Sequence, residues 1–196
     1  MINLKIIIGS TRPNRFSEKI IPWVLENSKA FEQLSVEVLD LRDYPIPFLS
    51  EEISPAHIED RKYNNKASLR FSDKILEADA FIFITPEYNH GYSGVLKNAI
   101  DSIYVEWQNK PAGIISYGEV GGANAIQQLR NVLTEIYMHS VKTAVHIFNP
   151  WNLEAKEVDA NGNLNINALD RYTKTFKKML SELIWWSKAL KNHREK

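Results

Sequence analysis

The stretch Leu-Lys-Ile-Ile-Ile-Gly-Ser-Thr-Arg-Pro-Asn-Arg-Phe-Ser at residues 4–17 decides the fold class. Its first five residues form a short apolar run interrupted by Lys5, and Gly9 begins a loop of hydroxyl and basic residues. A helical pattern follows from Ser17, although Pro22 lies inside it and would be costly beyond the first turn. Short apolar runs are typical of strands that are buried on both faces of a parallel sheet. The stretch therefore predicts a strand, a loop and a helix in that order.

The same alternation of strand and helix continues along the chain. Further apolar runs occur at residues 36–39, 80–84 and 112–116, and a fifth, more alternating run at 141–148 suits a sheet edge. Helical patterns occupy residues 17–31, 55–77, 94–103 and 123–138 and the segment from 166 onwards, and residues 149–166 are expected to form a loop. This alternation predicts right-handed βαβ units and a doubly wound parallel sheet. We expect residues 1–196 to form a single domain, since the length suits one α/β domain.

Composition excludes several classes of function. The chain is 44% hydrophobic and 24% charged, and its 24 basic residues balance its 24 acidic residues, so net charge points neither to nucleic acid nor to a membrane surface. It has no cysteine, which excludes disulfides, thiolate nucleophiles and sulfur-ligated metals. No apolar stretch approaches the roughly 20 residues that span a bilayer. We expect a cytoplasmic protein that binds neither nucleic acid nor membrane.

The loop at residues 9–17 offers a cradle for an anion. Ligands of doubly wound sheets bind beyond the carboxyl ends of the strands, where this loop lies. Its hydroxyls, its two arginines and the free N–H groups of a helix start suit a phosphate. It lacks the Gly-Lys-Ser/Thr ending of a Walker A loop and the repeated glycines of a dinucleotide fingerprint, so a phosphomonoester fits better. The alternative is that Ser17 only caps the helix and that the arginines are solvated.

Two further loops also follow strands. Residues 85–94 combine an aromatic pair, an amide, a carboxylate and two glycines, which could line the edge of a planar heterocycle. The alternative for this segment is an ordinary surface turn. Residues 116–122 contain three glycines, which permit close backbone approach and positive φ. The three loops together predict a binding site at one edge of the sheet.

Three motifs carry a resemblance to a known family. They are Gly9-Ser10-x-Arg12-x-x-Arg15-x-Ser17, then Pro86-Glu87-Tyr88-Asn89 continuing to Gly94-Val95-Leu96-Lys97-Asn98-Ala99-Ile100-Asp101, and Gly118-x-x-Gly121-Gly122. In order and spacing they resemble the NAD(P)H-dependent FMN reductases, which include azo, quinone and chromate reductases, over roughly residues 1–150. The resemblance implies a flavodoxin-like three-layer α/β sandwich with a five-stranded parallel sheet of order 2-1-3-4-5 and helices on both faces. It also implies FMN as cofactor and NADPH or NADH as electron donor.

The resemblance implies roles for particular residues. The FMN phosphate would be held by Ser10, Arg12, Arg15 and Ser17, although the family often has a small hydroxyl residue where this chain has Arg15. The isoalloxazine would be lined, largely by backbone, by Pro86, Glu87, Tyr88 and Asn89, and its other edge would be approached by Ser116, Gly118, Gly121 and Gly122. Lys97, Asn98 and Asp101 are assigned a structural role. No catalytic acid, base or nucleophile is expected, because hydride transfer is the chemistry of the cofactor. No metal ligand is expected, because no two histidines stand at a metal-ligand spacing. Tyr88 is expected to shape the nicotinamide side of the ring.

The resemblance also implies a homodimer or homotetramer and a small-molecule acceptor, namely a quinone, an azo compound, a metal oxyanion or a flavin. Trp107, Trp151, Trp185 and Trp186 could belong to an interface, or they could be core and loop packing. One alternative function is a flavodoxin-type electron carrier, but such carriers are strongly acidic and this chain is neutral. A flavin-dependent sensor or partner-binding protein is another alternative. A phosphate-binding hydrolase is the least favoured, because no nucleophile has an evident base beside it.

Overall fold

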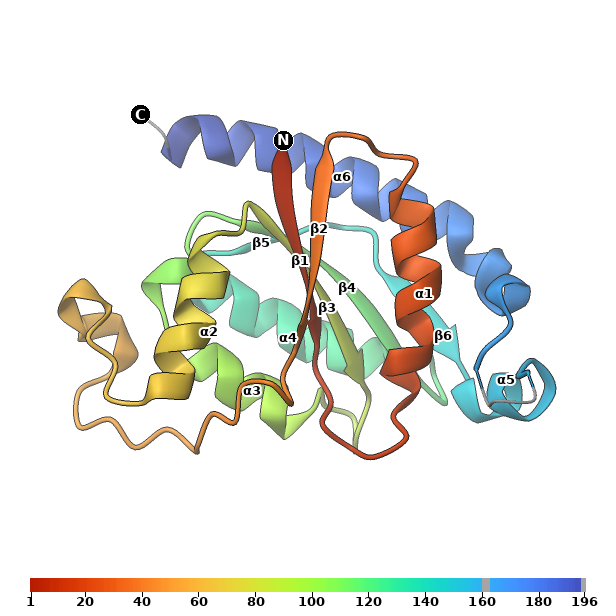
Figure 1. The fold of residues 1–196 in the computed structure, drawn as a ribbon, viewed down its shortest axis with the longest axis horizontal. Coiled ribbons are helices and arrows are strands. Elements are labelled where there is room, and N and C mark those ends of the chain that lie inside the picture. The colour runs from red at the N-terminus through yellow and green to blue at the C-terminus, as the bar shows by residue number, and fades with distance from the viewer. Residues whose placement is uncertain (160–162, 195–196) are drawn as a thin grey trace.

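The structure is a computed structural model that describes residues 1–159 and 163–194. Its strands are β1 (Ile2–Ile8), β2 (Leu34–Asp40), β3 (Ala80–Pro86), β4 (Pro111–Gly118), β5 (His139–Ser140) and β6 (Val145–Phe148). They form one sheet with the order β2-β1-β3-β4-β5, in which β6 also pairs with β4, and every pairing is parallel. The predicted flavodoxin-like order is confirmed (Figure 1).

The fifth position of the sheet is shared by two short strands. β5 pairs with Pro111 and Ala112 at the start of β4, and β6 pairs with residues from Ile115 to Gly118 at its end. Between them, Arg130 donates to the carbonyls of Val141 (3.2 Å) and Lys142 (2.7 Å), which draws this backbone to α4. Only residues 145–148 of the run predicted at 141–148 form a strand, β5 lies just before that run, and the sheet has six strands where five were predicted.

The helices cover both faces of the sheet, as predicted for a three-layer sandwich. They are α1 (Phe16–Ser28), α2 (Lys66–Leu76), α3 (Gly94–Asp101), α4 (Ala123–Glu135), α5 (Pro150–Lys156) and α6 (Asp170–Arg194). One core cluster lies between the sheet and α1 and α6, and it contains Ile20, Trp23 and Phe176. The other lies between the opposite face and α2, α3 and α4, and it contains Phe71 and Trp107. Trp107 therefore packs in the core, which is one of the two alternatives, interface or core packing, that the sequence left open. No helix in the described part of the chain could span a membrane.

Residues 55–77 were expected to carry a helical stretch that ends just before the third strand, and α2 is that helix; the loop expected at 149–166 is wrong in part. The pattern at 55–77 becomes a helix only at Lys66, because the Asn65 side chain accepts from the N–H groups of Ala67 (2.8 Å) and Ser68 (3.2 Å) and caps it there. The preceding segment holds only short 3₁₀ turns. The predicted loop at 149–166 contains α5, which starts with proline at its first position, a place that proline favours.

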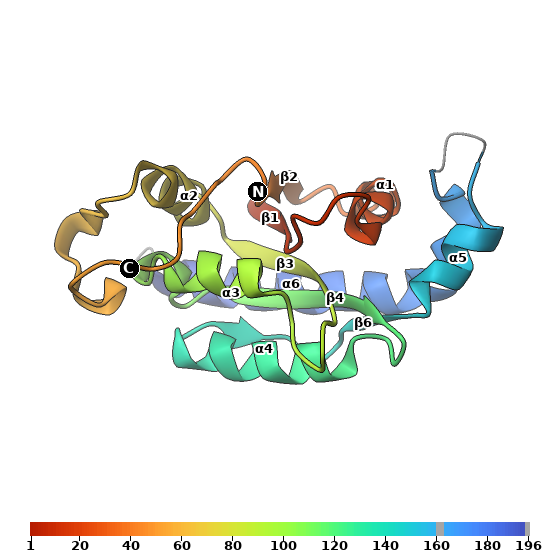
Figure 2. The same cartoon turned by 90° about the horizontal axis from the view of Figure 1, so that it is seen from below.

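The three loops of interest meet at one edge of the sheet. β1, β3 and β4 run side by side and in parallel, so the loops that follow them share an edge. This is the lower edge in Figure 1, seen from below in Figure 2, and α5 lies beside the start of α1 there. The start of β1 and the end of α6 lie at the opposite edge.

Candidate functional site

A cavity of about 270 Å³ opens at the carboxyl edge of the sheet. It is lined by Arg12, Asn14, Arg15 and Phe16 from the first loop, Pro86, Glu87 and Tyr88 from the second, Tyr117 and Gly118 from the third, and Pro150 and Trp151 from α5. The three loops singled out in the sequence thus share one cavity. Its volume approaches the roughly 300 Å³ at which small-molecule sites begin.

The start of α1 leaves polar groups for a ligand. No side chain caps this helix. The Ser17 hydroxyl in its first turn is buried and, within the described residues, makes no hydrogen bond of good geometry. The hydroxyl of Tyr117 is its polar neighbour: burial raises the pKa of Tyr117 to about 12, and Ser17 opposes that rise. Uncapped N–H groups at a helix N-terminus suit an anion, and the buried Ser17 hydroxyl lies beside them.

The two arginines of the first loop lie in different surroundings. Arg12 is exposed, and its guanidinium makes no ion pair or hydrogen bond within residues 1–159 and 163–194. Arg15 is buried and donates to both oxygens of Asp40, to the carbonyl of Ser10 and to Glu18 (2.9 Å). The free cation at the cavity is therefore Arg12, whereas the charge of Arg15 is committed to carboxylates.

Asp40 and Arg42 hold the first loop in place. Burial opposes ionisation of Asp40, but hydrogen bonds from Arg15 and from the Arg42 N–H outweigh it and lower the pKa of Asp40. The Arg42 side chain also donates to the carbonyls of Arg12 (2.6 Å) and Thr11 (3.4 Å). Both residues lie at the end of β2 or just after it, and the sequence analysis missed them because neither belongs to a recognisable motif.

The second loop is a tight hairpin. Tyr88 and Gly91 exchange both backbone hydrogen bonds (2.8 and 2.9 Å), and Asn89 and His90 between them have φ of 48° and 65°. Two successive left-handed residues are typical of a type I′ turn. Asn89 is exposed at the tip and does not line the cavity, whereas Tyr88 does.

Glu87 joins the second loop to α4. Its carboxylate accepts from the N–H groups of Asn124 (2.9 Å) and Ala125 (3.2 Å) and from the Asn124 side chain (3.0 Å). Burial would raise the pKa of Glu87, but these donors outweigh it and lower the pKa. The carboxylate therefore occupies the N-terminus of α4, and that helix start is not free for a ligand.

The glycines of the third loop permit close backbone packing. Gly121 and Gly122 have φ of 68° and 69°, and a Cβ on Gly122 would lie 1.9 Å from Ser116 Oγ. The Ser116 hydroxyl itself donates to the carbonyl of Thr85 (2.9 Å), and this bond links the start of the third loop to β3. Gly118 alone of these residues lines the cavity.

Comparisons with known proteins agree on one family. The family model for NADPH-dependent FMN reductase matches residues 2–152. The chain belongs to the NADPH-dependent FMN reductase family. An NAD(P)H-dependent FMN reductase of Schizosaccharomyces pombe is 38% identical over 138 residues, which are 70% of this chain and 68% of that protein. An NADPH:quinone oxidoreductase of Arabidopsis thaliana is 29% identical over 174 residues, 84% of this chain and 82% of that one.

A solved structure shows the same fold. The flavoenzyme FerB of Paracoccus denitrificans, an NAD(P)H:acceptor oxidoreductase, superimposes with a TM-score of 0.72 over 96% of this chain and 98% of that chain, at 23% identity.

The residues of this FMN reductase family member fit FMN at the cavity. The α1 start, with the buried Ser17 hydroxyl and the exposed Arg12, suits the phosphate. Phe16 and Tyr117, 5.3 Å apart and edge to face, supply an apolar wall for a ring system. Gly118 lines the cavity as well, and its missing side chain leaves room for Glu87, whose Cβ a Cβ there would meet at 3.2 Å.

The predicted residues divide into two groups. Arg12, Arg15, Pro86, Glu87, Tyr88 and Gly118 line the cavity, whereas Ser10, Ser17, Asn89, Ser116, Gly121 and Gly122 do not. Phe16 and Tyr117 line it but were not named as site residues, although Phe16 stands inside the first motif and Tyr117 inside the loop at 116–122. Trp151 and Pro150 come from the segment that was expected to be a loop.

Replacing Glu87 by glutamine tests its bond to α4. At pH 7, Glu87→Gln should lower stability by about 1 kcal/mol, because the negative charge at the helix start is lost. A carboxyl whose pKa is lowered by folding stabilises the protein above its unfolded pKa near 4.5, and this contribution is lost as pH falls through the lower folded value. In thermal melts from pH 7 to pH 3, the difference in Tm between Glu87→Gln and the unmodified protein should therefore shrink below about pH 4.5. A gap that stays constant over this range would contradict the role given to Glu87.

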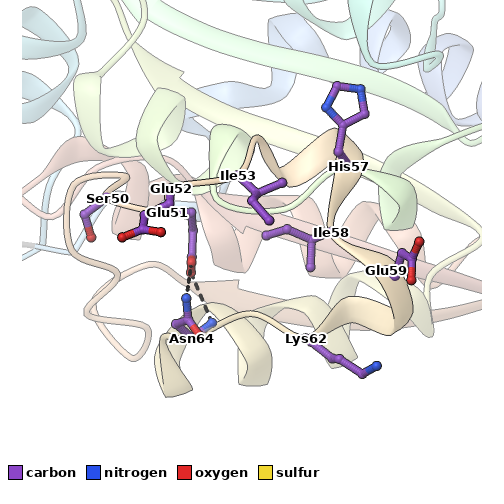
Figure 3. Close-up of a pocket in the computed structure, with 9 residues that line it drawn as sticks. All are labelled: Ser50, Glu51, Glu52, Ile53, His57, Ile58, Glu59, Lys62 and Asn64. Atoms are coloured by element: carbon purple, nitrogen blue, oxygen red, sulfur yellow. Dashed lines mark hydrogen bonds between the residues drawn. The ribbon is translucent and has the colours of Figure 1, made fainter.

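A second cavity, of about 600 Å³, lies within residues 50–64 (Figure 3). Its lining includes Glu51, Glu52 and Glu59, and Glu51 is already engaged by the backbone and side chain of Asn64. It contains none of the predicted site residues. No group of three metal-ligating side chains occurs among the described residues, there or elsewhere. The smaller cavity is therefore the candidate functional site.

Proposed function

We propose that this protein binds FMN at the carboxyl edge of its sheet, accepts a hydride from NADPH or NADH, and delivers electrons to a small acceptor. The observation that carries the proposal is the cavity itself, where an uncapped helix start and aromatic walls converge. A phosphate on a planar heterocycle satisfies both ends of such a site. Membership of the FMN reductase family supports the same chemistry.

The side chains of this protein serve to bind FMN and to orient it. When bound, FMN supplies the hydride chemistry, so the protein needs no general base for that step. Arg12, Ser17 and the first N–H groups of α1 would hold the phosphate. Arg15, Asp40 and Arg42 fix the loop that presents them, and Glu87 fixes the second loop against the third.

The acceptors that suit the site are small molecules: quinones, azo compounds, metal oxyanions or free flavin. The name of the Arabidopsis relative, NADPH:quinone oxidoreductase, favours quinones among them. The protein is proposed to form a homodimer or homotetramer. Phe48 is 87% exposed, and its burial by a second copy would remove apolar surface from water. Sedimentation of the purified protein as a monomer at micromolar concentration would contradict this assembly.

Steady-state kinetics separate a reductase from the alternative functions. The FMN-loaded protein should oxidise NADPH or NADH, with a rate that depends on both the donor and an added quinone. An electron carrier or a sensor would bind FMN without oxidising either nucleotide at a comparable rate, and that result would contradict the proposal.

Replacing Tyr88 by alanine tests the donor side of the site. Tyr88 lies at the cavity, 40% exposed, on a hairpin whose backbone bonds do not involve its ring. Tyr88→Ala should raise the KM for the pyridine nucleotide about tenfold, because a ring contact of roughly 1 kcal/mol or more is removed, and should leave FMN bound. Equilibrium dialysis of FMN beside KM measurements checks both parts. Release of FMN together with an unchanged KM would assign Tyr88 to the cofactor instead.

A further inference from the structure

The start of α5 contributes a wall to the cavity that sequence motifs did not reveal. The family match ends at residue 152, two residues into the part of α5 that follows Pro150. Pro150 and Trp151 line the cavity together with the three motif loops. Trp151 is therefore a cavity residue at the very end of the region that the family shares.

The position of Trp151 is fixed from both sides. Before it, the Asn149 N–H donates to the carbonyl of Gly118 (2.9 Å), which ties the start of α5 to the third loop, and Asn149 turns the chain with φ of 46°. After it, Leu153 is buried in the core cluster beneath α1 and α6. An indole held between two anchors can act as a preformed contact surface.

The aromatic side chains of the cavity form an inner and an outer pair. Phe16 and Tyr117 are buried and pack edge to face. Tyr88 and Trp151 remain 40% and 50% exposed while lining the same cavity. Half-exposed aromatic surface at a cavity gains free energy when a flat apolar molecule covers it.

We propose that Trp151 determines acceptor specificity, by packing its indole against planar aromatic acceptors of the quinone type and so favouring them over inorganic acceptors. This inference rests on the proposed function. In the overall reaction NAD(P)H and one proton reduce the quinone to the hydroquinone and leave NAD(P)⁺, so that two electrons and two protons are transferred. An inorganic anion has no flat apolar face and gains nothing from the indole.

The first test is equilibrium binding, which needs no turnover. Menadione is titrated into the oxidised, FMN-loaded protein without pyridine nucleotide. Trp151→Ala should weaken its binding about tenfold, the size expected for loss of one aromatic contact, and Trp151→Phe should fall between the two. Trp185→Ala is the matched control, because Trp185 is 64% exposed on α6 and outside the cavity. It should bind menadione as the unmodified protein does.

The second test compares two acceptors in one assay. The ratio of kcat/KM for menadione to kcat/KM for ferricyanide should fall about tenfold in Trp151→Ala and stay constant in Trp185→Ala. An unchanged ratio, or menadione binding that does not weaken, would overturn the proposal. So would loss of FMN as the main effect of Trp151→Phe, since the indole would then cover the cofactor. Failure of the reductase function has a different signature: the unmodified protein would not oxidise NAD(P)H, although menadione binding could still be measured.

Discussion

Replacing Gly122 by alanine should abolish detectable FMN binding and lower the free energy of unfolding by about 3 kcal/mol or more, which is a fall in Tm of roughly 6–12 °C. A Cβ at this position would lie 1.9 Å from Ser116 Oγ, 2.4 Å from Ser116 Cβ and 2.9 Å from the Tyr117 nitrogen. A rotation of Ser116 cannot relieve the last two contacts, so the backbone must move. The left-handed conformation of Gly122, with φ of 69°, adds about 1–2 kcal/mol of strain for any L-residue.

Gly94 provides the matched control for this substitution. It is the first residue of α3 and borders the second loop, and a Cβ there would meet nothing within 4 Å. Gly94→Ala should therefore leave FMN affinity and Tm close to their original values. Fluorescence titration with FMN and thermal melts of both variants give the comparison. Normal FMN affinity in Gly122→Ala would show that the third loop does not need its present backbone path.

The two arginines of the first loop should give opposite results when each is replaced by methionine. Arg12→Met should weaken FMN binding 10- to 100-fold with little change in Tm, because an exposed guanidinium that is free to contact phosphate is lost. Arg15→Met should cost about 2–4 kcal/mol of stability, because Asp40 and the Ser10 carbonyl lose their buried partner. The lower end of that range applies because the Asp40 side chain is one quarter exposed.

A double variant separates stability from binding at Arg15. Arg15→Met with Asp40→Asn removes both charges and should recover part of the lost stability, since no unpaired carboxylate remains. Chemical denaturation of the single and double variants measures this coupling. If instead Arg15→Met lost FMN affinity and kept its stability, Arg15 would contact the phosphate directly, as the family resemblance implied.

The edge of the sheet that carries the site could be predicted from the sequence. The apolar runs at 4–8, 80–84 and 112–116 indicate parallel strands, and parallel strands place their following loops at one edge. Only the order of the elements along the chain is needed for this prediction. It brought together the three loops, which the structure shows around one cavity.

The direction of individual side chains could not be predicted in the same way. The Arg15 guanidinium pairs with Asp40, which is 25 residues further along the chain at the end of β2, and no local pattern reports that contact. Glu87 stands in a motif, yet its carboxylate caps α4 because two N–H groups there lie within reach. Trp151 lines the cavity because Asn149 and Leu153 anchor α5, and both are tertiary contacts.

The most direct test of the central claim is the flavin absorption of the FMN-reconstituted protein, followed anaerobically after one equivalent of NADPH and, separately, of NADH. We expect a bound flavin whose absorption band is bleached within the turnover time by at least one nucleotide, and restored when a quinone is added. A bound flavin that neither nucleotide bleaches, or a protein that binds no FMN, would contradict the account.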